Sequence, residues 1–369
     1  MMVFSSGSTG QAFMQNHTIS GGVLVNPELI LPESFKEKLT GEIGAPPPDA
    51  TPNSGRHHWV TDALIKYGLT LDGPLVSTIW FSDPDGAAHD HGIGSATAME
   101  SIKIVDTEFG RILAALKEKK LDKDFNIIIT ADHGFVTYVG KQGLTEFLIQ
   151  HGLKRDKDSD DVRIVEGAIY VKDHEATIIQ KIVSKLQAEE WIGGIFTPAK
   201  NAGDTKGSVA GTLSFESIHW NHKERAADIL VDENWDDRKN DKGYAGASFS
   251  RGVAGHGGLS PYEVHIALLA SGPSFKKSFS SELPTSNVDI APTILAIHSL
   301  TIPTSMDGRI LDELLIDSKN STKIKVKKEQ LTSSAPFAGG KYTLTLHRTI
   351  FGEHQYIDFA KVERVSGKP

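Results

Sequence analysis

Two short apolar runs separated by a long amphipathic segment constrain the fold of this 369-residue chain more than any other feature. Residues 75–81 (LVSTIWF) and 126–130 (NIIIT) are rich in β-branched and aromatic side chains, which predicts buried strands. Residues 96–119 place apolar side chains at helical spacing and end in lysines, as a helix C-terminus prefers. Residues 264–270 (VHIALLA) predict a third strand. This alternation of strands and helix predicts a three-layer α/β/α sandwich with a mostly parallel sheet.

The sequence also predicts how the chain divides into segments. Residues 1–151 and 243–322 are predicted to form one discontinuous α/β core. Residues 152–242 are more polar and hold short strand candidates and one helix candidate, which indicates a small inserted α+β subdomain or lid. Residues 323–369 alternate polar and apolar side chains around Gly339-Gly340. That pattern predicts a small antiparallel β element packed on the core.

The composition excludes several classes of function. The sequence has no cysteine, which rules out disulfides, thiolate metal sites and cysteine catalysis. The formal net charge is −8 and there is no basic stripe, which argues against binding of duplex nucleic acid. No run approaches the roughly 18–20 apolar residues that span a bilayer. These features leave the cellular compartment and the oligomeric state open.

Asp and His side chains with glycines follow two of the predicted strands and precede the third. Residues 81–92 (FSDPDGAAHDHG) follow the first strand, and residues 130–134 (TADHG) follow the second. Because ligands bind beyond the carboxyl ends of strands in open α/β sheets, these segments are expected to converge. Residues 254–258 (AGHGG) precede the strand at 264–270. They reach the same site only if that strand runs antiparallel to the other two.

The ligand types in these segments indicate which metals they suit. Carboxylates and imidazoles without thiolates suit Zn²⁺ and tolerate Mn²⁺ or Fe. Each segment alone is more often a polar turn than a metal site. All three in this order, each adjoining a predicted strand, indicate a site for two divalent ions. Two such ions roughly 4 Å apart stabilise the attacking and leaving oxygens of a phosphoryl transfer.

These segments resemble the nucleotide pyrophosphatase/phosphodiesterase group of the alkaline-phosphatase superfamily. Pro84-Asp85-x-x-Ala88-His89-x-x-Gly92 is similar to its Pro-Asp-x-x-Gly-His-x-x-Gly element, with alanine before the histidine. Ala131-Asp132-His133-Gly134 resembles its Asp-His-Gly-Met element, with Phe135 in place of methionine. Gly255-His256-Gly257 looks like its last metal-histidine element. Residues 289–293 (DIAPT) and 306–309 (MDGR) resemble the helix and loop that close that fold.

The resemblance implies a metal-dependent hydrolase of phosphate esters acting on a small phosphorylated or phosphodiester substrate. It implies that Asp85, His89 and His256 hold one ion, and that Asp132 and His133 hold a second. Zinc is the expected metal, with manganese or iron as alternatives. The family nucleophile, a Thr or Ser at a helix N-terminus, and a further aspartate ligand have no match here. Both are expected upstream of Met1, and a sheet lacking that segment is expected to expose an apolar edge.

Several residues in or near these segments have more than one possible role. Residues 5–10 (SSGSTG) carry hydroxyls after an apolar run, but a turn is their ordinary role and no aspartate precedes them. His91 and Asp83 lie in the predicted metal loop and are candidates for substrate contact. Asp85 is preferred as the ligand because only it has the family spacing to His89. His57-His58 has no partner pattern and is expected at the surface or in a satisfied core position.

Other functions stay open. The same superfamily includes phosphonate hydrolases, phosphomutases and sulfatases, although a sulfatase needs a cysteine or serine to convert. A catalytically inactive metal-binding fragment is an alternative from another class, and it predicts stoichiometric metal without turnover. A purely structural α/β module predicts no bound metal.

Overall fold

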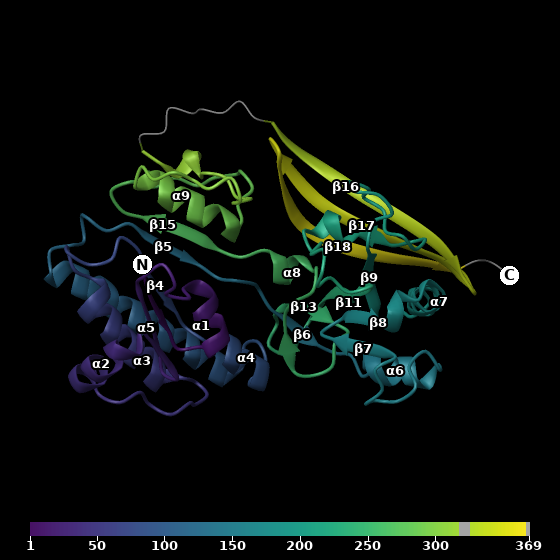
Figure 1. Ribbon diagram of the computed structural model, residues 1–369, viewed down its shortest axis with the longest axis horizontal. Coiled ribbons are helices and arrows are strands. Elements are labelled where there is room, and N and C mark those ends of the chain that lie inside the picture. Colours follow the sequence, from purple (N-terminus) through teal and green to yellow (C-terminus); the bar gives the residue numbers. More distant parts are fainter. Residues whose placement is uncertain (317–324, 367–369) are drawn as a thin grey trace. The chain divides into compact units, whose positions relative to one another are not determined.

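The computed structural model describes residues 1–316 and 325–366, and the chain divides into two compact units (Figure 1). Unit 1 comprises residues 1–127, 253–255 and 270–273, and unit 2 comprises the rest of the described chain. The predicted boundary between residues 322 and 323 lies outside the described residues. The division into a core, an inserted segment and a tail therefore stays a prediction.

Unit 1 is built on a four-stranded sheet in the order β3-β2-β1-β4. Strand β1 (Met2–Ser5) pairs in parallel with β2 (Val23–Asn26) and with β4 (Ser77–Trp80), whereas β3 (Leu29–Leu31) is antiparallel to β2. The predicted α/β fold with a mostly parallel sheet is thus confirmed. Strand β4 lies at the edge of this sheet and its residues are only half-buried. The expectation of a fully buried strand was wrong here because an edge strand is covered on fewer sides.

The helices of unit 1 pack around this sheet. The predicted helix at 96–119 is α5 (Ala96–Glu118), and the Ser95 hydroxyl caps it by accepting a hydrogen bond from the Ala98 N–H. Ile112 and Leu116 of α5 belong to one core with Phe4 of β1 and residues of α3. The other helices are α1 (Thr9–Gln15), α2 (Lys36–Ile43), α3 (Ser54–Ala63) and α4 (Asp85–His91).

Two further strands pair with each other in a small sheet. The predicted second strand is β5 (Ile127–Thr130), but it is partly exposed rather than buried, with Ile129 39% exposed. The predicted third strand begins later than expected, as β15 (Leu268–Ser271). Ser260 and Pro261 start a short helix instead, α8 (Pro261–Val264), because serine and proline suit the first positions of a helix. The predicted antiparallel direction of this strand stays a prediction.

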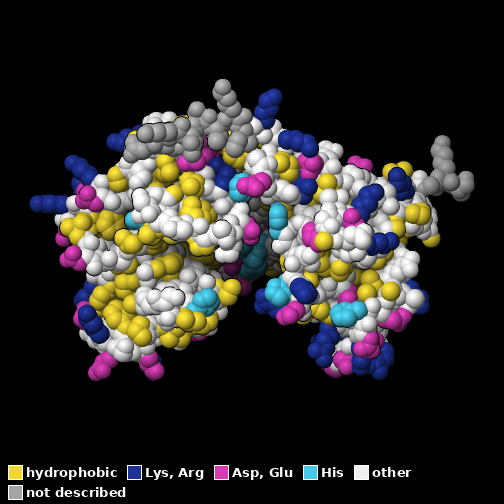
Figure 2. Space-filling view, turned by 45° about the horizontal axis from the view of Figure 1, so that its top comes forward, with side chains coloured by type: hydrophobic (Ala, Val, Ile, Leu, Met, Phe, Trp, Pro, Cys, Tyr) yellow, Lys and Arg dark blue, Asp and Glu magenta, His cyan; other side chains and the backbone are white. Residues whose placement is uncertain are grey.

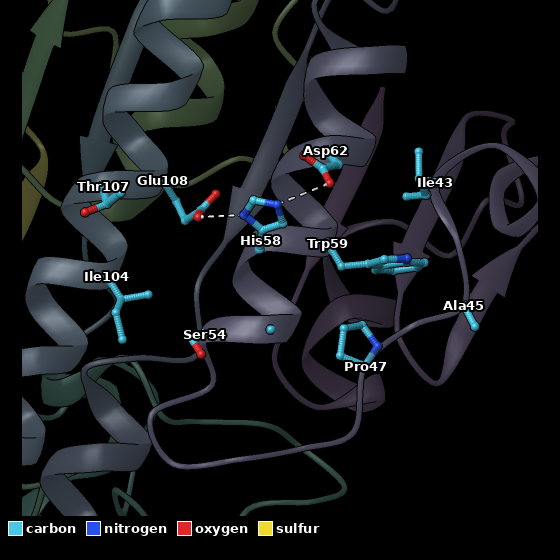
Figure 3. Close-up of a pocket in the computed structure, with 11 residues that line it drawn as sticks. Ile43, Ala45, Pro47, Ser54, His58, Trp59, Asp62, Ile104, Thr107 and Glu108 are labelled. Atoms are coloured by element: carbon cyan, nitrogen blue, oxygen red, sulfur yellow. Dashed lines mark hydrogen bonds and ion pairs between the residues drawn. The ribbon is translucent and has the colours of Figure 1, made fainter.

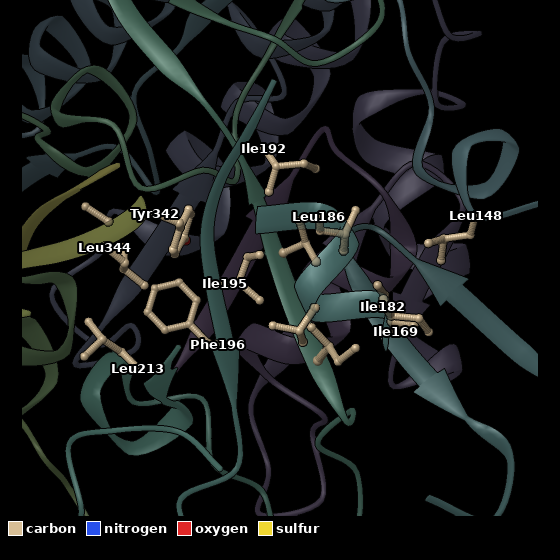
Figure 4. Packing of buried hydrophobic residues seen from close by; sticks show 14 of the residues in the cluster. Leu148, Ile169, Ile182, Leu186, Ile192, Ile195, Phe196, Leu213, Tyr342 and Leu344 are labelled. Carbon is tan, nitrogen blue, oxygen red and sulfur yellow. The ribbon is translucent and has the colours of Figure 1, made fainter. Parts of the chain in front are cut away.

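A five-stranded sheet in the order β10-β9-β11-β8-β7 forms the centre of unit 2. Every residue of β9 is buried, and Ile182, Val183 and Leu186 of helix α7 (Ala176–Gln187) belong to the same core (Figure 4). Gly167, at φ +84°, makes the turn between β7 and β8. The strands are β7 (Val162–Val165), β8 (Ala168–Val171), β9 (Ile192–Thr197), β10 (Leu213–Ser214) and β11 (Ile229–Glu233).

The predicted C-terminal β element is confirmed as a three-stranded antiparallel sheet of β16 (Val326–Phe337), β17 (Gly340–Phe351) and β18 (His354–Ser366). Leu344 and Leu346 of β17 join the core of the five-stranded sheet. The Tyr342 hydroxyl donates to the carbonyl of Gly193 in β9 at 2.9 Å. This C-terminal sheet therefore packs against the segment that was predicted to form an insertion.

A third sheet in unit 2 contains β6 (Val136–Tyr138), which is parallel to β13 (Ala245–Ser248). Strand β12 (Trp235–Lys239) is antiparallel to β13. The remaining helices of this unit are α6 (Leu144–Gln150) and α9 (Ile290–Ile297). Within the described residues, no helix combines the length and the apolar character needed to cross a bilayer.

The two closing motifs of the sequence contact each other in unit 2. Asp289 is fully buried, and its Oδ1 accepts a hydrogen bond from the Arg309 N–H at 2.8 Å. The Arg309 guanidinium makes a bidentate ion pair with Glu313 and donates to the Tyr356 hydroxyl. The residues 289–293 and 306–309 are therefore joined by a direct hydrogen bond.

Candidate metal centre

Asp85 and His89, here called the α4 pair, lie on one face of helix α4 because they are four residues apart. Asp85 Oδ1 is 3.3 Å from His89 Nε2. The other ring nitrogen of His89, Nδ1, lies 2.9 Å from the carbonyl oxygen of Ala254. A carbonyl only accepts, so Nδ1 carries the hydrogen, and in the neutral ring the lone pair of Nε2 faces Asp85.

Asp132 and His133, here called the β5 pair, repeat this arrangement after strand β5. Asp132 Oδ2 is 3.2 Å from His133 Nε2, and His133 Nδ1 donates to the carbonyl of Gly134 at 2.9 Å. The His133 backbone N–H donates to Asp132 Oδ1 at 3.1 Å. This hydrogen bond favours the ionised carboxylate, the form in which Asp132 would bind a metal.

The geometry of the two pairs fits a divalent cation. In a tetrahedral zinc site with ligands at about 2.0–2.2 Å, two ligand atoms lie roughly 3.3–3.5 Å apart. The oxygen–nitrogen separations of 3.3 Å in the α4 pair and 3.2 Å in the β5 pair are close to that value. In addition, a backbone carbonyl fixes the Nδ1 hydrogen of each histidine, which is the usual partner of a metal-bound imidazole.

His256 is the fifth predicted ligand, and it follows the segment 253–255 directly in the chain. The α4 pair belongs to unit 1 and His256 to unit 2, so a shared ion site of Asp85, His89 and His256 stays a prediction. The ring of His256 also stacks on that of His133, with centroids 3.4 Å apart.

The loops that carry His133 and His256 are joined by backbone hydrogen bonds. The Gly134 N–H donates to Glu263 O at 2.7 Å, and the Phe135 N–H donates to Tyr262 O at 3.0 Å. The Glu263 carboxylate in turn accepts from the Gly258 N–H and from the Ser260 hydroxyl. One buried glutamate therefore holds the segment that follows His256 against the loop that carries His133.

Sequence reasoning missed a buried hydrogen-bond network behind the α4 pair. His57 is fully buried, as a satisfied core residue, and its Nε2 lies 3.0 Å from Asp83 Oδ2. Its Nδ1 lies 2.9 Å from Ser6 Oγ. Because Ser6, His57 and Asp83 are 51 and 26 residues apart, no spacing pattern reveals them.

This network also determines the role of the alternative candidates. Asp83 is 5% exposed, so its carboxylate faces the interior rather than a substrate. Burial raises the pKa of Asp83, but hydrogen bonds from His57 and from the Asn53 N–H outweigh it and lower the pKa. His91, at the end of α4, is exposed.

A pocket of about 590 Å³ opens elsewhere on unit 1, between α3 and α5 (Figure 3). Trp59 and Pro47 form its apolar wall, and His58 lies between Asp62 and Glu108. None of the five predicted metal residues lines this pocket. On the face shown in Figure 2, Lys and Arg side chains are scattered among acidic and apolar ones, grey atoms apart.

Comparison with solved structures places the fold in a known class. The structure is similar to murine ectonucleotide pyrophosphatase/phosphodiesterase 5, with a TM-score of 0.52, 20% identity and coverage of 70% of this chain and 64% of that one. It is also similar to the wild-type alkaline phosphatase PafA, with a TM-score of 0.54, 16% identity and coverage of 71% and 53%. The chain therefore shares its α/β fold with these two proteins.

Residues 26–244 match the family described as type I phosphodiesterase/nucleotide pyrophosphatase, and the chain belongs to this family. Human ectonucleotide pyrophosphatase/phosphodiesterase family member 5 is 25% identical over 245 residues, which cover 64% of this chain and 45% of that protein. Mouse family member 7 is 36% identical over 87 residues, which cover 23% and 20%. The matched part thus spans less than half the length of these relatives.

Proposed function

We propose that this protein is a metal-dependent hydrolase of phosphate esters that uses a two-metal site. The observation that carries the proposal is the repeated Asp–His geometry, with Nε2 and a carboxylate oxygen 3.2–3.3 Å apart in both pairs. Membership of the phosphodiesterase family supports the same chemistry.

The proposed ligands divide into two sets. Asp85, His89 and His256 would hold one ion, and Asp132 and His133 would contribute to the other. Zinc suits these oxygen and nitrogen donors best, and manganese or iron is tolerated. When bound, divalent cations neutralise phosphate oxygens and stabilise the departing oxygen. The protein's own part is to fix the Nδ1 hydrogens at Ala254 O and Gly134 O, so that both Nε2 atoms stay directed at the ions.

The proposed substrate is a small phosphodiester or nucleotide-like phosphate ester. The family description supports this class, and a solved structure of murine member 5 contains AMP. The α4 pair and Asp132 are partly exposed, which gives a substrate access to them.

The test measures metal content and hydrolysis together. Purified chain is loaded with Zn²⁺, dialysed, analysed for metal and assayed with an aryl phosphodiester. Asp85→Asn and His256→Ala are expected to weaken metal binding by orders of magnitude. Matched controls are Asp90→Asn, an exposed aspartate on the same helix, and His265→Ala, an exposed histidine nine residues after His256. Both controls should bind metal as the parent chain does.

The outcomes separate the alternatives. Turnover that a chelator abolishes supports the hydrolase. Stoichiometric metal without turnover favours the inactive metal-binding fragment. Unchanged metal content in both Asp85→Asn and His256→Ala would refute the ligand assignment.

A further inference from the structure

Ser6, His57 and Asp83 form a continuous buried chain of hydrogen bonds, here called the relay, within unit 1. Their residues are 1%, 0% and 5% exposed. His57 Nε2 lies 3.0 Å from Asp83 Oδ2, and His57 Nδ1 lies 2.9 Å from Ser6 Oγ. The ring of His57 also meets that of Phe81 edge-on, with centroids 5.3 Å apart. The ring is therefore held from several sides.

The relay has the residue types of a hydrolytic Ser-His-Asp triad, but its geometry does not suit a nucleophile. A triad serine must reach a substrate carbonyl or phosphorus. Ser6 is almost fully buried, and its Oγ already accepts a hydrogen bond from the Ser82 N–H at 3.0 Å. Its Oγ also lies 3.2 Å from the carbonyl oxygen of Trp80. The hydroxyl thus joins the ends of β1 and β4 and has no space for a substrate.

The other end of the relay fixes the start of helix α4. Asp83 Oδ1 accepts a hydrogen bond from the Ala87 N–H in the first turn, at 3.3 Å. Asp83 Oδ2 accepts from the Asn53 N–H at 2.7 Å, directly before α3. Asp83 therefore ties the first turn of α4 to α3, and His57 ties Asp83 to the end of β1.

The position of this helix start matters because α4 is short. It has seven residues, and Asp85 and His89 lie in its first and second turns. Ala87 and Ala88 face the interior, so the opposite face carries the α4 pair. A small rotation at Asp83 would therefore change the direction of both proposed ligands at once.

We propose that Ser6, His57 and Asp83 are positioning residues that hold helix α4 in the orientation in which Asp85 and His89 face the same divalent cation. This inference rests on the proposed metal role of the α4 pair. The relay lies behind the helix rather than at the ion, so its effect is on ligand direction and not on ligand number. Groups that hydrogen-bond a metal ligand directly contribute about 10- to 100-fold to metal affinity, and this range sets the scale expected for a change in ligand direction.

The experiment compares metal affinity in matched variants of the full chain. Zn²⁺ affinity is measured by competition with a chromophoric chelator, and Co²⁺ is used as a second probe because its visible absorption reports ligand geometry. His57→Leu and Asp83→Asn are expected to weaken Zn²⁺ binding by about 10- to 100-fold and to alter the Co²⁺ spectrum. His57→Gln keeps a donor towards Asp83 and should recover part of the affinity. His58→Leu, one residue further on the same helix and exposed, is the control and should behave as the parent chain.

Each result decides a separate point. If Asp85→Asn leaves metal affinity unchanged, the proposed function fails whatever the relay does. If Asp85→Asn loses the metal while folded His57→Leu and Asp83→Asn keep parental affinity and Co²⁺ spectrum, only the positioning role fails. The double variant should lose less than the sum of the two single losses, because the residues act through one chain.

Two further measurements keep the inference testable. If His57→Leu does not fold, Asp83→Asn and Ser6→Ala decide the question, since each removes one end of the relay and leaves the imidazole in place. Covalent labelling of Ser6 by a fluorophosphonate would overturn the positioning role, because it would show an accessible nucleophile.

Discussion

Gly134→Ala tests how the β5 pair is held. A Cβ at residue 134 would lie 2.0 Å from the carbonyl oxygen of Tyr262, which is backbone and cannot rotate away. Non-bonded carbon–oxygen contacts settle at about 3.3 Å or more. The loop carrying Asp132 and His133 would therefore have to move by more than about 1 Å, because the difference between these two distances sets the shift.

That shift breaks two backbone hydrogen bonds, from the Gly134 N–H to Glu263 O and from the Phe135 N–H to Tyr262 O. At about 0.5–1.5 kcal/mol each, with a steric contribution of about 1–3 kcal/mol, the free energy of unfolding should fall by about 2–6 kcal/mol. Urea unfolding of the metal-free chain measures it. Gly110→Ala, in the exposed interior of α5 with nothing near its Cβ, is the control and should stabilise by about 0.5–1 kcal/mol. Parental stability and metal affinity in Gly134→Ala would refute the argument.

Three other substitutions test the fold around the site. Arg309→Met should lower the free energy of unfolding by about 3–5 kcal/mol, because it leaves the Glu313 carboxylate largely buried without its ion pair; parental stability in urea would contradict this. Phe196→Ala should destabilise by about 3–5 kcal/mol through a cavity between the two packed sheets of unit 2, measured in the same way. Burial, with the nearby Glu263 and Glu233 charges, raises the pKa of Asp232 well above its usual range. The folded state therefore binds more protons than the unfolded state. The free energy of unfolding should fall as pH rises from about 4 through the pKa of Asp232 in the folded state, and the fall should be shallower in Asp232→Asn.

The elements that the sequence predicted well are those specified by local patterns. Helix α5 was predicted to within one residue of its observed end because its apolar spacing and its terminal lysines agree. The C-terminal hairpins followed from alternation around a glycine, which sits at φ +106°. The burial of the strands was predicted less well, because it depends on which strands lie beside them in the sheet. Strand β4 lies at an edge, and no local pattern states that.

The start of β15 shows a competition between two local signals. The apolar run 264–270 favours a strand, but Ser260 and Pro261 favour a helix start. The Ser260 hydroxyl also donates to the Glu263 carboxylate across the first turn. Val264 is therefore the last residue of the helix, and the strand begins four residues later, at Leu268. The capping signal was present in the sequence and outweighed the apolar run at its first residues.

The two proposed ligand pairs differ in how much of their geometry the sequence contains. His133 is oriented by the carbonyl of the next residue, Gly134, so the short motif carries both the ligand and the group that fixes it. His89 is oriented by the carbonyl of Ala254, 165 residues away. The first turn of its helix is held by Asp83, whose carboxylate in turn contacts His57. Spacing alone identifies Asp85 and His89 as a pair but contains nothing about their direction. The α4 pair should therefore be the more sensitive of the two to substitutions far from it in the sequence, because its orientation exists only once the distant segments have packed.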